Sequence, residues 1–435
     1  MFFEGPVSKT IATLISSTAL SQLLTLAVLP VLARQLGPAE MGYWGSFIAV
    51  FSVLAPVAAL TFPQAIVLAD SDRKAKVLSQ LSLICALSTA LFIVLVFAVG
   101  TSLFPALLPS YLTLLPVILL ASAIVSAVAV QLVQQWLLRQ QQFSQLAKTD
   151  LYQAILLNLS KLAIVLFWPV AVALMLLQAV MPFCQFIWLR GWRLFDTRVE
   201  TESTAVSAKP HSQQYNFRSL LREFRDFPLF QSPQQLLNAA AQALPVFILA
   251  PAFGLVSVGY YTLAKTVLLA PAAWVNKAIA DFLYPAFSTL QRRQLALRPL
   301  FVRSTLWLAV FGLVPVSLLF CFAPWLFSLF FGEQWLPAAE IAQWLCPWLY
   351  CFLVNPPAVK LLMVLRLQSA SLVLNAVTLC FRAAVLWYGA MYLHDLQLAI
   401  LAFSLVGVMH NVLFIALAWW GCSRADLLLN RSVSS

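Results

Sequence analysis

Seven charged residues stand within or at the end of long apolar stretches, where a charge is costly unless it serves a purpose. They are Arg34, Lys161, Lys265, Lys277, Asp281, Lys360 and Arg382. All except Asp281 are cations, and Arg382 lies deepest in its stretch. Ammonium and guanidinium groups can replace the lost hydration of an anion with charge-assisted hydrogen bonds. The pattern therefore predicts an interior that binds an anionic group.

The spacing of these charges leaves alternatives open. Lys277 and Asp281 are four residues apart, so they either line a cavity or neutralise one another across one helical turn. Lys265 and Lys277 lie about 120° apart around an ideal helix. They share a face only if the helix bends, for which Pro271 supplies a kink. Lys161 either lines a cavity or extends to the membrane interface.

A stripe of amides adds a second kind of polar group. Gln231, Gln235, Asn238 and Gln242 follow one another at spacings of four, three and four residues, which places them on one face of a helix. Such a face either hydrogen-bonds sugars in a wet cavity or joins neighbouring helices.

The other reactive side chains offer little chemistry. The seven cysteines have neither metal-ligand nor disulfide spacing. His410, within an apolar stretch, either carries a coupling proton or makes a structural hydrogen bond. The chain lacks the nucleotide-binding pattern Gly-x4-Gly-Lys-Ser/Thr. We expect no cofactor, no metal and no catalytic residue.

The composition indicates whether these polar side chains lie in a soluble protein or in a membrane protein. Of the 435 residues, 62% are hydrophobic and 9% are charged. A soluble domain carries about 25% charged residues, so this chain is expected to be an integral membrane protein. Because many apolar stretches reach about 20 residues, they are expected to span the membrane as helices.

We predict an all-α polytopic membrane protein with twelve spans in two six-helix bundles. The first bundle is expected in residues 1–190, a cytoplasmic linker in 191–227 and the second bundle in 228–435. The linker ends in a basic amphipathic run that either lies on the membrane or is solvated. The predicted spans are 9–33, 41–69, 77–104, 110–138, 148–167, 169–190, 229–251, 256–286, 301–331, 336–363, 368–392 and 396–420.

The basic residues between the spans give an orientation. Nearly all Lys and Arg of the loops fall on one side, and the opposite loops hold Arg34 and almost no other basic residue. The positive-inside rule therefore places both termini and the linker in the cytoplasm. The formal charge of +11 mostly reflects this asymmetry, so we expect no nucleic-acid partner.

A short motif occurs twice, about half the chain apart. Each copy has a glycine, four residues, a second glycine and a tyrosine, and each follows a Leu-Pro-Val sequence. The glycines are Gly37 and Gly42 in the first copy, and Gly254 and Gly259 in the second. Each copy lies between the first two spans of its half, which favours duplication over coincidence and predicts a parallel repeat. We interpret the glycines as structural, for a tight turn or a close helix approach.

The first copy also carries a family resemblance. Leu29–Tyr43 reads LPVLARQLGPAEMGY, and the Arg-x-Leu-Gly-Pro-x-x-x-Gly pattern resembles the first loop of the Wzx-type oligosaccharide flippases. These form the polysaccharide-export branch of the MATE-like (MOP) transporter superfamily. Ala69–Arg73 and parts of Val258–Ser288 are also similar. The resemblance implies two bundles around a central cavity that turns an undecaprenyl-pyrophosphate-linked oligosaccharide to the outer leaflet.

The resemblance further implies a role in the bacterial inner membrane, in making O-antigen lipopolysaccharide, capsule or exopolysaccharide. Alternating access, an ion gradient of unidentified ion, membrane lipids and a polysaccharide polymerase machinery are implied as well. A multidrug or organic-cation antiporter of the same fold should have an acidic cavity, whereas this interior is cationic. A membrane polymerase or ligase should have a large extracytoplasmic loop, whereas every predicted outward loop is short.

The predicted orientation can be tested by labelling one cysteine. Ala205→Cys in a cysteine-free background should react with a membrane-impermeant thiol reagent only after the cells are opened, because the linker is expected in the cytoplasm. Labelling in intact cells would reverse the orientation and the direction of any transport.

Overall fold

The computed structural model describes residues 6–103, 113–140, 142–189, 223–225, 227–365 and 367–434. Within these ranges the chain forms helices and turns and no strand, which confirms the predicted all-α class. Most of the predicted linker, including most of its amphipathic run, lies outside the described residues.

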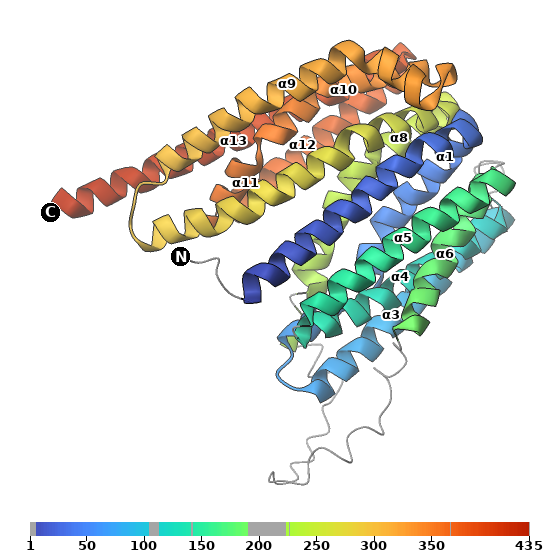
Figure 1. Cartoon of the computed structure of the whole chain (residues 1–435), viewed down its shortest axis with the longest axis horizontal. Coiled ribbons are helices and arrows are strands. Elements are labelled where there is room, and N and C mark those ends of the chain that lie inside the picture. The colour runs from blue at the N-terminus through green and yellow to red at the C-terminus, as the bar shows by residue number, and fades with distance from the viewer. Residues whose placement is uncertain are drawn as a thin grey trace, which may run out of the picture. The chain divides into compact units, whose positions relative to one another are not determined.

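Figure 1 shows the order of the helices along the chain. The first half contains α1 (Pro6–Ala58), α2 (Phe62–Ala65), η1 (Ile66–Leu68), α3 (Asp72–Leu103), α4 (Leu114–Arg139), α5 (Phe143–Phe167) and α6 (Ala171–Trp188). The second half contains η5 (Phe227–Gln231), α8 (Ser232–Arg292), α9 (Arg298–Phe331), η6 (Glu333–Trp335), α10 (Leu336–Val354), α11 (Pro356–Val364), α12 (Gln368–Tyr388), η7 (Gly389–Leu393) and α13 (Leu396–Ser434).

Two of these helices are too long to be single spans. At 1.5 Å per residue, α1 and α8 would measure about 80 and about 90 Å, against a hydrocarbon core of about 30 Å. Both have non-helical backbone at one glycine, Gly37 in α1 and Gly254 in α8. In the described residues nine helices can cross a membrane, and the bent pair of α10 and α11 makes ten. Dividing α1 and α8 at their glycines gives the twelve predicted spans.

The chain divides into two compact units. The first comprises residues 1–35 and 46–243, and the second comprises 36–45 and 244–435. Each predicted bundle is one continuous stretch of the chain, and the boundaries of the two units differ from those of the bundles in two places. Residues 36–45 belong with the second unit, and the first turns of α8 belong with the first unit.

In the first unit, α4 is the central helix and packs against α3 and α6. Fifteen of its 26 residues are buried, many of them Ala, Val or Leu. A helix that is apolar on all sides is expected in the interior. The outer helix α3 instead exposes large apolar side chains such as Leu91 and Phe92. In a membrane, this exposed apolar surface meets lipid.

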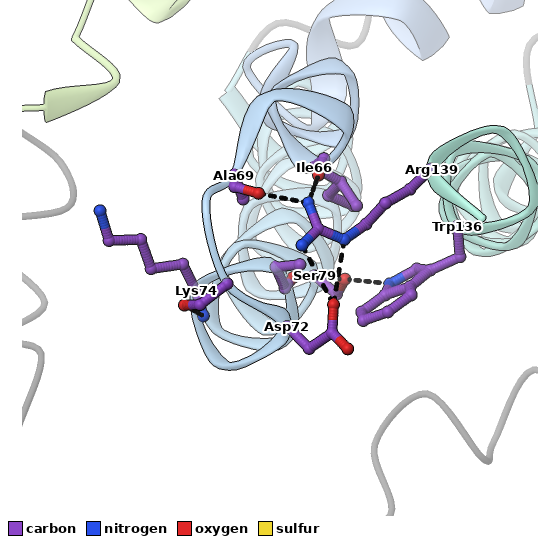
Figure 2. A network of polar contacts seen from close by, with 9 residues as sticks. Ile66, Ala69, Asp72, Lys74, Ser79, Trp136 and Arg139 are labelled. Carbon is purple, nitrogen blue, oxygen red and sulfur yellow. Dashed lines mark hydrogen bonds and ion pairs between the residues drawn. The ribbon is translucent and has the colours of Figure 1, made fainter. Parts of the chain in front are cut away.

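The last residue of α4, Arg139, ties this helix to the segment that precedes α3. Figure 2 shows its guanidinium donating hydrogen bonds to the carbonyl oxygens of Ile66, at 3.1 Å, and Ala69. It also donates to the carboxylate of Asp72, at 3.0 and 3.1 Å. The segment from Ala69 to Arg73, which carries part of the family resemblance, therefore anchors the end of α4.

The first turns of α8 are held by the first unit through side-chain hydrogen bonds. The Thr61 hydroxyl donates to the carbonyl oxygen of Phe227 at 3.0 Å. Gln231 donates its amide N–H to the amide oxygen of Gln64. These contacts join η5 to the loop around α2, and they explain why this part of α8 belongs with the first unit.

In the second unit, α10 packs against α9 and α13, and α12 packs against α13 (Figure 1). The break between α10 and α11 falls at Asn355, where the two helices bend by 41°. Asn355 is buried and donates to Asn411 of α13 at 2.6 Å. This bond pairs the amide nitrogen of Asn355 and the amide oxygen of Asn411, which the apolar surroundings would otherwise leave unpaired.

The two motif copies pack closely against each other, and this contact lies within the second unit. A Cβ atom on Gly42 would lie 1.7 Å from the carbonyl oxygen of Leu255. A Cβ atom on Gly259 would lie 2.0 Å from the carbonyl oxygen of Pro38. Leu255 and Pro38 occupy the same place in the two copies, directly after the first glycine. The contact is therefore reciprocal, and each copy needs its second glycine to admit the backbone of the other.

The first glycine of each copy breaks its helix. Gly37 has φ 70° and ψ 170°, and Gly254 has φ 78° and ψ 176°. This backbone region is essentially restricted to glycine, and other residues are strained there by about 1–3 kcal/mol. The duplicated motif thus has two structural roles, a helix break at its first glycine and a close crossing at its second.

Alanine substitutions should separate these roles in thermal unfolding of the detergent-purified protein. Gly37→Ala and Gly254→Ala should each cost about 1–3 kcal/mol through backbone strain. Gly42→Ala and Gly259→Ala should lower the midpoint further, because each Cβ would meet a backbone oxygen at 2.0 Å or less. Gly312→Ala is the control, since its Cβ would meet nothing closer than 3.9 Å. An unchanged midpoint for Gly42→Ala would refute the crossing.

Candidate functional site: a buried arginine in the second unit

Arg382, the leading candidate from the sequence, lies on α12 between aromatic rings of two other helices. Its guanidinium carbon is 5.3 Å from the ring centre of Trp348 on α10 and 5.0 Å from that of Phe403 on α13. The two rings also contact each other, with their centres 5.9 Å apart. Two helices of the second unit thus present aromatic rings to a cation carried by a third, a contact that stabilises a guanidinium by about 0.5–2 kcal/mol depending on its burial.

The guanidinium has no anionic partner among the described residues. Its Nε is buried without a hydrogen-bond partner, and no ion pair in the described part of the chain involves Arg382. The titratable groups in electrostatic range of it are Tyr261 and His410. Cation–π contacts leave the N–H donors of an arginine without acceptors. The site is therefore a partly buried cation that forms no ion pair within the described residues.

Gly407 of α13 makes room for this arrangement. A Cβ atom there would lie 2.6 Å from Nη2 of Arg382 and 2.5 Å from a ring carbon of Trp348. The carbonyl oxygen of Gly407 accepts a hydrogen bond from Asn411 at 2.8 Å, and Asn411 is in turn held by Asn355. A chain of polar contacts thus connects the break between α10 and α11 to the place where the guanidinium lies.

Sequence reasoning missed the aromatic partners and the glycine. The available signal was a glycine and an asparagine four residues apart in an apolar stretch, Gly407 and Asn411, which places both on one face of α13. Trp348 and Phe403 gave no signal, because single aromatic residues are common in membrane helices. Their proximity to Arg382 depends on how α10, α12 and α13 pack.

His410 makes the structural contact that was one of its two predicted roles. Its Nδ1 lies 3.1 Å from the hydroxyl oxygen of Thr378, one helical turn before Arg382 on α12. The His410 ring also packs on Phe414, with ring centres 4.8 Å apart. Its role in proton coupling stays a prediction.

Lys265 follows Tyr261 by one turn of α8, so the two side chains share a face of this helix. Tyr261 is 1% exposed and lies in electrostatic range of Arg382. Lys265 is itself partly buried. Tyr261 thus links this stretch of α8 electrostatically to Arg382. Whether Lys265 lines the same cavity as Arg382 stays a prediction.

The other predicted charges lie apart from this region or are not described. Lys277 is exposed, and the side chain of Asp281 lies outside the described residues, so their pairing stays a prediction. The backbone of α8 is non-helical at Gly254, whereas Pro271 keeps helical dihedral angles. Lys161 is partly buried on α5 of the first unit.

Arg34 and the residues of the amide stripe also differ in how exposed the structure leaves them. Arg34, on α1, is exposed. Gln231 makes the helix-to-helix contact with Gln64 described above. The rest of the stripe is partly buried at Gln235 and exposed at Asn238 and Gln242. Their role in binding sugars stays a prediction.

Solved structures with a similar fold are transporters. An inward-facing multidrug resistance MATE family transporter of the MOP superfamily matches with a TM-score of 0.73 at 15% identity, covering 94% of this chain and 96% of that chain. The lipid II flippase MurJ, in an inward closed conformation, matches with a TM-score of 0.70 at 13% identity, covering 96% and 90%. A MOP superfamily transporter from Pyrococcus furiosus, described as having a binding pocket of reverse polarity, matches with a TM-score of 0.55 at 14% identity, covering 96% and 95%.

At these identities the likeness defines the fold, which is that of the MATE-like transporters of the MOP superfamily. The sequence identifies the family more closely. The model of the family described as "Polysaccharide biosynthesis protein" matches residues 31–340, and the chain belongs to this family. No curated protein sequence matches the chain significantly.

Replacing Arg382 should show that its charge lowers the stability of the folded protein. Arg382→Met keeps similar length without charge and removes an unsatisfied buried donor, so it should raise the stability of the purified protein by about 1–3 kcal/mol. The matched control is Arg139→Met, which leaves two carbonyl oxygens and Asp72 without their donor and should lower stability. Thermal unfolding in detergent measures both. A lower midpoint for Arg382→Met would show that the arginine has a structural role.

Proposed function

We propose that this protein is a flippase for an undecaprenyl-pyrophosphate-linked oligosaccharide in the bacterial inner membrane. It would serve the synthesis of a surface polysaccharide such as O-antigen, capsule or exopolysaccharide. Membership of the polysaccharide biosynthesis family and a fold shared with the lipid II flippase MurJ support the substrate class. The observation that carries the proposal is the partly buried guanidinium of Arg382, which forms no ion pair among the described residues and whose buried Nε has no hydrogen-bond partner.

The chemistry of the substrate matches this site. The lipid tail stays in hydrocarbon throughout transport, so only the sugars and the diphosphate need a polar path. Moving an anion out of water costs many kcal/mol unless opposite charge and hydrogen bonds replace its hydration. We propose that Arg382 and Lys265, both partly buried, supply that charge.

The aromatic surroundings of Arg382 suit transient binding. Faces of Trp348 and Phe403 stabilise the guanidinium when no ligand is present, by a weaker interaction than a carboxylate would provide. A diphosphate can therefore replace a weak interaction with charge-assisted hydrogen bonds. A buried ion pair with a protein carboxylate would instead compete with the substrate.

Transport would proceed by alternating access, biased by an ion gradient whose ion we leave open. The crossing of the two motif copies brings backbone against backbone at Gly42 and Gly259, which would hold residues 36–45 in the second unit during this movement. The termini would lie in the cytoplasm, and the outer product would pass to a polysaccharide polymerase. A multidrug or organic-cation antiporter is the rival, and a cationic site disfavours it because like charges repel.

Charge substitutions test the proposal in cells that lack the native protein. Arg382→Ala and Lys265→Ala should each reduce the export of surface polysaccharide at least tenfold, because the diphosphate loses a compensating charge. Lys265→Arg should retain more export than Lys265→Gln, since an amide supplies only a dipole. Surface polysaccharide is measured by gel analysis of cell extracts.

Protein abundance in the membrane is measured in the same cells. Loss of abundance in step with loss of export would show a folding defect and would count against a binding role. Normal export by the variant with both Ala substitutions would overturn the proposal. Export of organic cations that survives both substitutions would favour the antiporter.

A further inference from the structure

A groove of about 680 Å³ runs along the outside of the second unit, where α9 begins beside α13. Helix α9 supplies most of its lining, and α13 supplies Trp419. The lining residues from α9 include Arg298, Val302, Arg303, Leu306, Trp307 and Val310. None of these residues belongs to the interior site around Arg382.

The lining changes character along the helix. Arg298 and Arg303 stand in the first two turns, and Trp307 stacks on Phe311 with ring centres 4.9 Å apart. Val310, about one turn further along α9 than Trp307, is 64% exposed. Arg298 and Val310 are about 18 Å apart along the helix at 1.5 Å per residue. That length is close to one leaflet of a hydrocarbon core of about 30 Å, so the groove follows a lipid from its head group into its chains.

The two guanidinium groups at the mouth of the groove form no ion pair in the described part of the chain. The guanidinium carbon of Arg298 lies 4.4 Å from the ring centre of Trp419. The nearby carboxylate of Asp426 is occupied by the backbone N–H groups of Leu297, at 3.0 Å, and Arg298, at 3.1 Å. Both arginine side chains therefore remain available to a ligand.

We infer that this α9–α13 groove binds an anionic phospholipid of the membrane leaflet at which α9 begins. Two guanidinium groups match a phosphodiester whose head group lacks a compensating cation, and indole rings favour the depth of the head groups. The apolar wall from Val302 to Val310 accommodates an acyl chain. A zwitterionic phospholipid fits less well, because its own cation meets two arginines. The basic side of the chain, on which Arg298 and Arg303 lie, is the side that the sequence assigns to the cytoplasm.

Native mass spectrometry of the full-length protein, purified in detergent, tests this inference. The protein is mixed with phosphatidylglycerol or phosphatidylcholine of the same chains, and the bound lipid is counted. Phosphatidylglycerol should bind at least tenfold more tightly than phosphatidylcholine. Arg298→Gln/Arg303→Gln should remove that preference. The control Arg292→Gln/Arg293→Gln removes two exposed arginines outside the groove and should keep it.

A second variant separates lipid binding from simple anion binding. Val310→Trp fills the apolar part of the groove without changing its charge, so it should weaken phosphatidylglycerol binding several-fold. Inorganic phosphate at millimolar concentration should displace little of the lipid from the native protein. Equal retention of the two lipids, unchanged binding by Arg298→Gln/Arg303→Gln, or full displacement by phosphate would each overturn the inference. Thermal unfolding confirms that every variant is folded.

Discussion

The cost of leaving a polar group unsatisfied in hydrocarbon is the constraint on which this structure depends. It confines the described chain to helices, and it determines how the buried polar side chains are used. Arg139 gives its donors to two carbonyl oxygens and a carboxylate, and Asn355 is paired with Asn411. Arg382 is an exception, because only aromatic faces accompany its guanidinium. Its Nε is one of several buried polar atoms without a partner in the described residues, such as both side-chain polar atoms of Gln185, and the proposed diphosphate would complete its site.

The same constraint limits where a membrane helix can break. Two of the breaks fall at Gly37 and Gly254, whose backbone conformations are nearly identical, because each is the first glycine of a repeated motif. The crossing at Gly42 and Gly259 then needs both copies at once, since each glycine admits the backbone of the other copy. A duplicated sequence satisfies this requirement automatically. The reciprocal contact therefore explains why one chain carries the same short motif twice.

Much of the fold could be predicted from the sequence, and rather less of the site. The twelve spans and the all-α class follow from long apolar stretches, and the repeat marked both helix breaks. Arg382 could be singled out because a lone charge in an apolar helix is unusual. Its surroundings could not be predicted, since Trp348 and Phe403 lie on helices whose contacts depend on packing and not on any local pattern. For Gln231 the sequence allowed two roles, binding sugars or joining neighbouring helices. Only the folded structure shows its hydrogen bond to Gln64, which joins two helices.

Three arginines of this chain have the same chemistry and different partners, and the partners distinguish their roles. Arg139 is paired by charge and hydrogen bonds, so it holds α4 in place. Arg298 lies over Trp419 at the mouth of the exposed α9–α13 groove, where we propose that a lipid head group supplies the anion. Arg382 is partly buried and forms no ion pair with a carboxylate in the described structure. A fixed carboxylate would hold this cation permanently, so the proposed binding and release of an anion depend on the lack of such a partner.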